Sequence, residues 1–302
     1  HGNALSLHRL FMKSLALYIT FAAVVLGYVV ARGFAAEFVM PLVPLWQWLG
    51  PVVLIVAPFY LWLADRVIED PEDALYATGL ALTGQGAADP AKIKQHCLSW
   101  LVKGFFAPLM AGFALTDINW LLAFDFTNLL ASGGSLYEFL YRFLFLIDVM
   151  FAASGYLLTL KLFDTHIRST EPTALGWMVC LACYAPFWQA LWDNFLNYDD
   201  DLYWGEWLQD MPFLWSAWAV VIIFCIAIYT WASVSFGPRF SNLTHRGIIT
   251  NGPYRYIKHP AYVAKNISWW MVSIPFISSG SVSTALANTC GMATVSFIYT
   301  MR

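Results

Sequence analysis

The densest group of chemically active side chains is the stretch from Phe236 to Tyr262, which contains no Asp or Glu. Its potential cations and its tyrosines are Arg239, His245, Arg246, Arg255, Lys258 and His259, with Tyr254, Tyr256 and Tyr262. Gly247 and the pair Gly252–Pro253 predict turns rather than helix. Such a stretch can bind a carboxylate or phosphate through its cations and stack a flat heteroaromatic ring on its tyrosines. We therefore expect a ligand site here rather than a bare positively charged anchor.

A second candidate is Asp148, near the middle of an apolar stretch that predicts a helix over 137–162. Ionisable residues inside a membrane are costly and mark functional sites by default. Asp148 is therefore either a proton relay or substrate contact, or a hydrogen-bonded packing residue. Glu138 and Arg142 lie four positions apart on the same stretch, which predicts a helix-stabilising ion pair.

The elements that must position these residues are transmembrane helices. The chain has 302 residues, of which 60% are hydrophobic and 12% charged, whereas soluble domains carry about 25% charged residues. Apolar runs long enough to cross a bilayer recur along the whole chain. An all-α fold is predicted, a polytopic transmembrane helical bundle, and the composition excludes most soluble globular and all disordered classes. No nucleic-acid partner is expected, and because the five cysteines lie in or beside apolar segments, no disulfide or metal site is expected either.

Windows of about 19 residues predict eight spans. These are 11–31, 45–64, 98–116, 137–162, 174–192, 212–235, 261–278 and 282–301. Lys and Arg gather at the N-terminus and after the second, fourth and sixth spans, whereas the alternate connections hold only Arg32. The connection 193–210 has six acids and no base. Because cytoplasmic segments are enriched in Lys and Arg, both termini and the 237–262 loop are predicted to be cytoplasmic in a multi-pass integral membrane protein.

The connection between the second and third spans, residues 65–97, carries two helix-start signals. Asp70 followed by Pro71 gives a cap and a proline at the first helical position, and Asp89 followed by Pro90 repeats the pattern. The first signal predicts a short helix that ends near Gly84. That helix either lies on the membrane surface or connects the spans by packing under the bundle.

The stretch from Thr244 to Tyr262 resembles the signature of the isoprenylcysteine carboxyl methyltransferases and the related phospholipid methyltransferases, integral-membrane enzymes that use S-adenosylmethionine. The resemblance covers about 60 residues at the C-terminal end. It implies a methyltransferase-like core over 211–302 with a cytoplasmic cofactor loop at 237–262. The helices of 1–210 carry no assignable motif. In the family an acidic segment closes the pocket, and it would follow Arg302.

Carried over residue by residue, the resemblance implies a turn that lines the cofactor pocket, followed by a histidine and a tyrosine at the cofactor. The implied cofactor-binding residues are Gly252, Pro253, Tyr254, Arg255, Tyr256, Lys258, His259, Pro260 and Tyr262. Lys258 stands where the family usually has Arg, which keeps the charge and loses the bidentate fork. Arg239, Arg246 and Arg255 are the candidates for holding an anionic acceptor or the carboxylate of the cofactor.

The implied reaction is a direct methyl transfer, in which the protein aligns acceptor, methyl group and sulfur and excludes water. No covalent nucleophile is required. The expected acceptor is a carboxylate or phosphate oxygen on a membrane lipid or lipid-modified molecule, because the cations of the loop attract an anion.

Two alternatives stay open. The stretch Lys258 to Lys265 is similar to the cofactor motif of the sterol and steroid reductases, membrane enzymes that use NADPH. Ala261 stands in place of their Asn and Lys265 in place of their acid, which favours the methyltransferase. The third possibility is a non-catalytic membrane subunit, a transporter or structural protein that has kept a degenerate methyltransferase fold.

Overall fold

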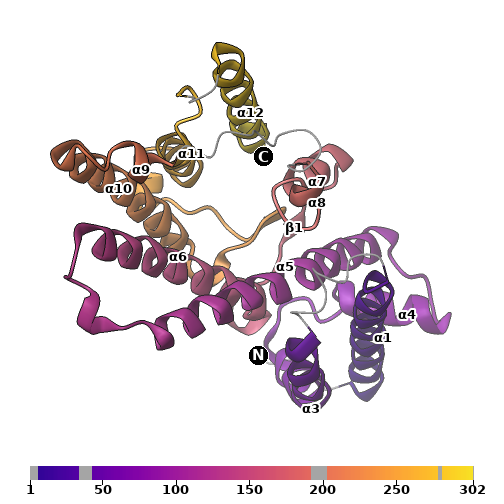
Figure 1. The fold of residues 1–302 in the computed structure, drawn as a ribbon. Coiled ribbons are helices and arrows are strands. Elements are labelled where there is room, and N and C mark those ends of the chain that lie inside the picture. The colour runs from indigo at the N-terminus through magenta and orange to yellow at the C-terminus, as the bar shows by residue number, and fades with distance from the viewer. Residues whose placement is uncertain (1–5, 34–42, 192–202, 278–280, 302) are drawn as a thin grey trace. The chain divides into compact units, whose positions relative to one another are not determined.

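The computed structural model describes residues 6–33, 43–191, 203–277 and 281–301. Almost every element in these ranges is a helix (Figure 1). The α-helices are α1 Leu7–Ala31, α3 Val43–Val67, α4 Ala74–Thr83, α5 Pro90–Ala123, α6 Gly133–Leu157, α7 Ala174–Leu181, α8 Phe187–Leu191, α9 Trp204–Trp207, α10 Pro212–Phe236, α11 Pro260–Ser273 and α12 Val282–Met301. The all-α prediction is confirmed for the residues described.

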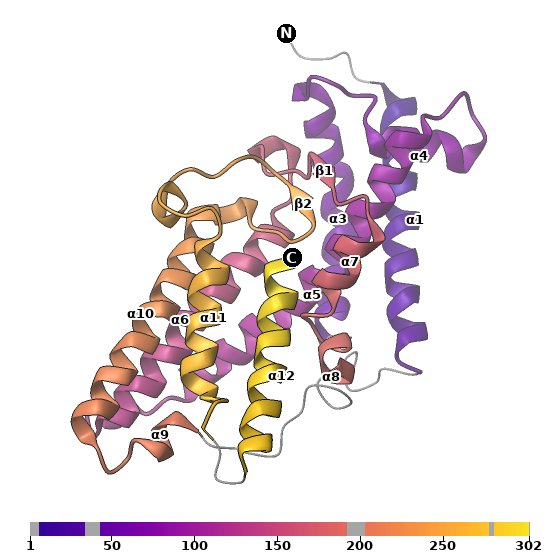
Figure 2. The same ribbon diagram turned by 90° about the horizontal axis from the view of Figure 1, so that it is seen from above.

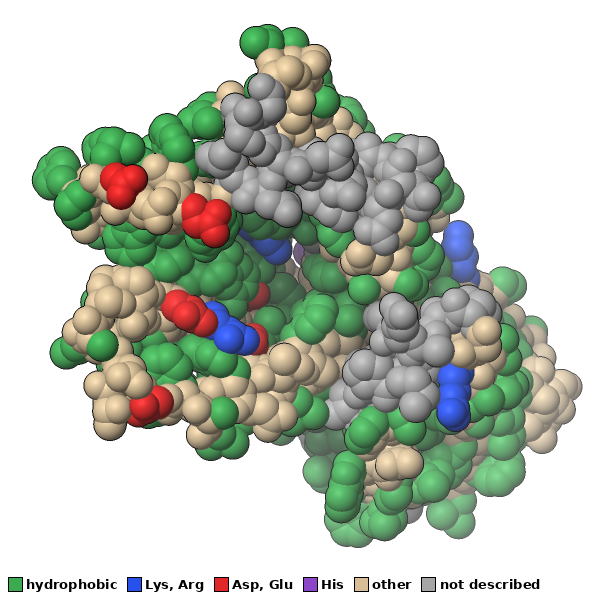
Figure 3. Space-filling view, in the orientation of Figure 1, with side chains coloured by type: hydrophobic (Ala, Val, Ile, Leu, Met, Phe, Trp, Pro, Cys, Tyr) green, Lys and Arg blue, Asp and Glu red, His purple; other side chains and the backbone are tan. Residues whose placement is uncertain are grey.

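Within the described ranges, four helices are long and apolar enough to cross a membrane: Leu7–Ala31, Trp46–Val67, Pro90–Ala123 and Pro212–Arg239. Hydrophobic side chains cover the visible surface of α1 and α3 in Figure 3. Ile55 on α3, for example, is 77% exposed, as suits a side chain that faces lipid. The chain is therefore a membrane protein, and the full count of eight spans stays a prediction.

The segment predicted as the fifth span, 174–192, is not one continuous helix in the described residues. Helix α7 ends at Leu181, and α8 begins at Phe187, directly after Pro186. Proline has no backbone N–H and its ring collides with the preceding turn, so it starts a helix rather than continuing one. The seventh predicted span, 261–278, is also shorter as a helix, because α11 ends at Ser273, two residues before Pro275.

The two helix-start signals in the connection 65–97 both lead into helices. Helix α4 ends at Thr83 with Gly84 as its C-terminal cap, as expected, but it begins at Ala74 because Asp73 caps it by accepting from the backbone N–H of Tyr76 at 3.1 Å. Asp70 instead accepts from the backbone N–H of Glu72 at 3.0 Å. The Asp89 carboxylate caps α5, which runs without interruption through the predicted third span.

The chain forms two compact units. The first consists of His1–Phe113, Ala153–Glu171 and Pro238–Gly247, and the second of Ala114–Ala152, Pro172–Gly237 and Ile248–Arg302. Each unit thus draws on both sides of residue 210. Acidic residues Asp193 to Asp201 of the predicted outer loop lie outside the described ranges.

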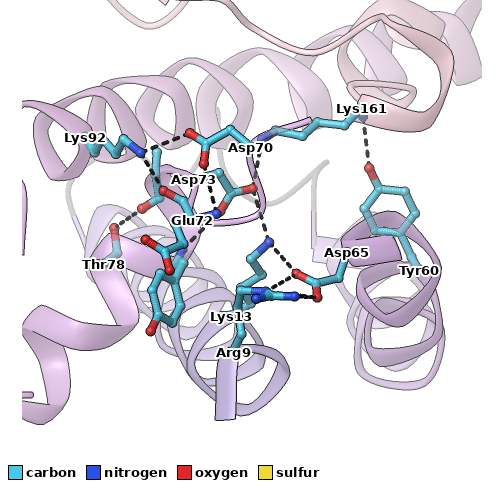
Figure 4. Close-up of polar contacts among 12 residues, drawn as sticks. Arg9, Lys13, Tyr60, Asp65, Asp70, Glu72, Asp73, Thr78, Lys92 and Lys161 are labelled. Carbon is cyan, nitrogen blue, oxygen red and sulfur yellow. Dashed lines mark hydrogen bonds and ion pairs between the residues drawn. The ribbon is translucent and has the colours of Figure 1, made fainter. Parts of the chain in front are cut away.

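A buried ion cluster organises the first unit (Figure 4). The Asp65 carboxylate on α3 accepts from Arg9 at 2.7 Å and from Lys13 at 2.9 Å, both on α1. The Asp65 side chain is fully buried and that of Lys13 is 2% exposed. Asp73, at the start of α4, pairs with Lys161 at 2.8 Å and lies 3.6 Å from Lys13. Charged groups from four chain segments therefore neutralise one another inside this unit.

Helices α10 and α11 run side by side in the second unit (Figure 2). The Trp218 indole on α10 donates to the backbone carbonyl of Met271 at 2.9 Å, which ties the two helices together. The predicted pair on α6 is confirmed, with Arg142 and Glu138 3.9 Å apart. The Arg142 guanidinium also lies 4.6 Å from the ring centroid of Trp120.

Candidate functional site

The predicted cofactor loop is divided between the two units. Residues 238–247 belong to the first unit and residues 248–262 to the second. Arg239 and Arg246 therefore lie in one unit, whereas the residues from Gly252 to Tyr262 lie in the other. Each part is built by its own local contacts.

A two-stranded antiparallel ladder fixes the part in the first unit. Strand β1, Ser169–Thr170, pairs with β2, Thr244–His245, so that Ser169 lies opposite His245. The backbone N–H of Arg168 donates to the carbonyl of His245 at 3.0 Å and extends the ladder by one bond. The loop is therefore held by backbone pairing to a segment far away in sequence.

Arg246 binds backbone carbonyls from three chain segments. Its Nη1 donates to Gly155 O at 2.7 Å and to Phe240 O at 2.9 Å, and its Nε donates to Thr165 O at 2.7 Å. Nη2 also donates to Thr165 O. The side chain is buried, and burial lowers the pKa of the guanidinium to about 10. These bonds position the loop, and an anion-holding role for Arg246 stays a prediction.

Arg239 takes part in an exposed charge cluster of the first unit. Its Nη2 lies 3.0 Å from the Asp164 carboxylate, which also pairs with Arg168 at 3.1 Å. The hydrogen bond from Arg168 and the charges of both arginines hold the pKa of Asp164 below its ordinary value. Arg239 thus already has a carboxylate partner within the unit.

The turn predicted to line the pocket is a 3₁₀ helix, η6 Gly252–Arg255, in the second unit. Gly252 has a φ of +58°, and a Cβ there would collide with the Ser235 hydroxyl and lie 3.3 Å from the Trp231 indole nitrogen. Pro253 is buried, and the Tyr254 ring meets the Phe236 ring edge to face at 5.0 Å. The turn is therefore packed closely against the end of α10.

An exposed basic and aromatic surface follows the turn. Arg255, Tyr256, Lys258 and His259 are exposed, and the Arg255 guanidinium lies 6.0 Å from the Tyr256 ring centroid. Pro260 then starts α11, and the His259 ring stacks on the Tyr262 ring with centroids 5.9 Å apart and an interplanar angle of 11°. This surface offers cations together with flat rings.

An aromatic cage surrounds the ammonium of Lys265, one turn further along α11. We define the cage as Tyr229, Trp269 and Tyr299, whose ring centroids lie 5.0, 5.1 and 5.5 Å from Lys265 Nζ. Aromatic faces attract cations at such distances. The Tyr262 ring reaches the cage through an edge contact with Tyr299 at 6.4 Å.

Asp148 lies beside the same cage. Its buried carboxylate accepts a hydrogen bond at 2.7 Å from the Tyr229 hydroxyl, and another from the Ser233 hydroxyl. Sequence reasoning singled out Asp148 but missed its partners and the cage. The available signal was the spacing of Tyr229 and Ser233, four positions apart and hence on one face of α10.

In comparisons with protein-family models, with curated proteins and with solved structures, nothing matches this chain. Assignment to the membrane methyltransferases stays a prediction that rests on the signature residues from Gly252 to Tyr262.

Proposed function

We propose that this chain is an integral-membrane methyltransferase that uses S-adenosylmethionine and binds it with the segment Gly252 to Tyr262. One observation carries the proposal. The signature residues lie along one segment of the second unit, from the close-packed turn at Gly252 to the stacked His259–Tyr262 pair, which contacts the aromatic cage through Tyr299.

Residues of this segment can bind the carboxylate, the heteroaromatic ring and the sulfonium of S-adenosylmethionine. Arg255 and Lys258 are exposed cations that can pair with a carboxylate. Tyr256 is 77% exposed and offers a flat face on which a heteroaromatic ring can stack. Aromatic rings also attract a sulfonium, because their faces carry partial negative charge. The sulfonium supplies both the methyl group and a strong leaving group, so the protein need only bind, orient and exclude water.

A membrane-embedded acceptor follows from the setting of the site. Because the turn at Gly252 packs against Ser235 and Trp231 near the end of α10, the site lies at the end of a helix that is long and apolar enough to cross a membrane. A lipid tail gains about 0.8 kcal/mol for each CH₂ that it buries among such helices. We propose a cytoplasmic site in an eight-span topology with both termini cytoplasmic, as the distribution of Lys and Arg predicts.

Cofactor binding by the purified full-length protein tests the proposal. Isothermal titration with S-adenosylmethionine should show binding, and His259→Ala and Tyr262→Ala should each weaken it at least about tenfold, the loss of roughly 1.4 kcal/mol of contact. His8→Ala is the matched control, since His8 belongs to the first unit, where its ring bonds Gln85 at 3.0 Å.

Parallel titrations with NADPH separate the alternatives. Binding of NADPH and not of S-adenosylmethionine would assign the chain to the reductases. Binding of neither would favour the non-catalytic subunit. If both signature variants bound S-adenosylmethionine as tightly as the wild type while folded, the site would be wrongly placed.

A further inference from the structure

A continuous series of contacts joins the signature histidine to the buried carboxylate. The His259 ring stacks on Tyr262, the Tyr262 ring meets Tyr299, and Tyr299 belongs to the cage around Lys265. Tyr229 of the same cage donates its hydroxyl hydrogen to Asp148. All of these residues lie in the second unit. Asp148 is therefore a part of the proposed site that the signature does not include.

The surroundings of Asp148 are those of a functional carboxylate. The Tyr229 hydroxyl holds its Oδ2 and the Ser233 hydroxyl its Oδ1, which fixes the orientation of both oxygens. Lys265 lies close enough for its charge to act on the carboxylate. Burial raises the pKa of Tyr254, and the neighbouring Tyr262 and Asp148 raise it further.

We propose that Asp148 accepts the proton released in the methyl transfer, and that the acceptor is a lipid-like thiol or amine that carries its proton at neutral pH. This inference rests on the proposed function. The sequence alone predicts an anionic oxygen, because it shows only cations in the loop. The structure adds a buried carboxylate that these contacts connect to the site, and a carboxylate repels an anionic acceptor and serves one that still carries its proton.

The step balances without any other reactant. The acceptor atom forms a bond to the methyl carbon while the carbon–sulfur bond breaks, and that electron pair stays on sulfur, which becomes a neutral thioether. The bond between the acceptor atom and its hydrogen breaks so that its electron pair stays on the acceptor atom, which an ammonium nitrogen needs before it can attack carbon, and the proton moves to a carboxylate oxygen of Asp148. Tyr229 and Ser233 are positioning residues, because they act by orienting Asp148.

Three probe acceptors with the same twelve-carbon chain test the inference in the full-length protein. Dodecanethiol and dodecylamine, the latter as its ammonium, carry a proton on the reacting atom at neutral pH, whereas dodecanoate has already lost its proton. Transfer of label from methyl-labelled S-adenosylmethionine should reach the thiol or the amine. Asp148→Asn should slow that transfer about 100-fold or more, the usual contribution of a positioned base, and leave cofactor affinity within about twofold of the wild type.

Asp117→Asn is the matched control. Asp117 is also an Asp on a helix of the second unit, and the same change there should leave the transfer rate unaltered.

The pH dependence of the transfer rate distinguishes a proton-accepting role of Asp148 from a purely structural one. The wild-type rate should fall on the acid side as Asp148 takes up a proton, and Asp148→Asn should lack that acid limb. The groups that face Asp148 are Tyr229 and Ser233 from α10 and Lys265 from α11.

The remaining outcomes of these experiments separate a failure of the inference about Asp148 from a failure of the proposed function. Transfer to dodecanoate alone, or an Asp148→Asn rate equal to that of the wild type, would overturn the inference and leave the proposed function standing. If no probe is accepted, the product formed in native lipid extract decides: a base-labile methyl ester overturns the inference. Absence of both cofactor binding and transfer would overturn the proposed function itself. If Asp148→Asn does not fold, Tyr229→Phe replaces it and should shift the acid limb of the pH profile.

Discussion

The Tyr229 hydroxyl donates a hydrogen bond to Asp148 Oδ2 at 2.7 Å, although the two residues are 81 positions apart in the chain. The bond joins α10 to α6 inside the second unit. The Thr230 hydroxyl adds a second link between the same helices, since it donates to the Leu144 carbonyl at 3.0 Å. The face of α10 that meets α6 is therefore polar where Asp148 lies.

Removing the Tyr229 hydroxyl should destabilise the protein. Tyr229→Phe leaves one oxygen of a buried carboxylate without this donor, and such a loss costs about 1–3 kcal/mol. Tyr18→Phe is the control, because the Tyr18 hydroxyl bonds the Leu54 carbonyl at 2.9 Å in an exposed setting. Denaturant unfolding in detergent should show the larger loss for Tyr229→Phe. Equal losses would mean that the Asp148 contact contributes nothing beyond an ordinary hydrogen bond.

Neutralising Asp65 should destabilise the first unit strongly. Asp65→Asn removes the charge that partners Arg9 and Lys13, and breaking a buried ion pair in this way costs about 3–5 kcal/mol. The matched change is Asp70→Asn, since Asp70 pairs with Lys92 at 3.0 Å while both side chains are well exposed. An exposed pair contributes only about 0–1 kcal/mol. Unfolding free energies that differ by less than about 1 kcal/mol between the two variants would contradict the assignment of a buried cluster.

Substituting Gly252 should affect stability and cofactor binding together. Gly252→Ala places a Cβ against Ser235 at a φ of +58°. Gly84→Ala is the matched control, because Gly84 has a φ of +67° with open space around its Cβ position. The left-handed conformation alone costs about 1–2 kcal/mol, and the collision at Gly252 should add about 1–3 kcal/mol.

Only Gly252→Ala should weaken S-adenosylmethionine binding, since it moves the turn that holds the signature residues. Titration calorimetry on both variants checks this. Unchanged affinity in a folded Gly252→Ala protein would show that the turn does not shape the cofactor site.

His166 should make stability fall as the pH drops through the range in which histidine titrates. Burial holds its pKa below the ordinary value, and the charges of Lys161, Arg168 and Arg246 lower it further, while Asp164 opposes them. The unfolded chain therefore takes up a proton first as the pH falls below about 6.5. Because the unfolded state then binds more protons, the free energy of unfolding decreases toward low pH.

His166→Gln should flatten this dependence between pH 7 and pH 5, conditions that bracket the ordinary histidine pKa of about 6.5. The check is a series of denaturant unfolding curves at fixed ionic strength. Identical slopes in the wild type and His166→Gln would contradict the prediction.

The sequence determines the helices well where long apolar runs end in capping residues. Helix α10, Pro212–Phe236, matches the span predicted over 212–235 because Pro212 starts it and Gly237 follows it. At 174–192 the same reasoning did not foresee the break between α7 and α8, because average apolarity conceals the single proline Pro186. A single proline decides whether a helix continues there, and an average hydropathy over about 19 residues does not reveal it.

The candidate site is built partly from contacts between sequence neighbours and partly from contacts between residues far apart in the chain. The turn at Gly252 and the stacked His259–Tyr262 pair involve neighbours in sequence, so a motif can indicate them. Contacts of Asp148 and Arg246 bridge many residues, and the carbonyls that Arg246 binds carry no side-chain signature. Only a three-dimensional arrangement identifies Arg246 as a residue that positions the loop.

The β1–β2 ladder also imposes an order on biosynthesis. Its two strands are separated by residues 171–243, and most of these belong to the second unit. The first unit cannot acquire its last segment, 238–247, until the ribosome has made α7 and α10. A nascent chain that ends before Arg246 leaves the carbonyls of Gly155 and Thr165 without its guanidinium. Maturation of the N-terminal helices therefore waits for translation of the C-terminal ones.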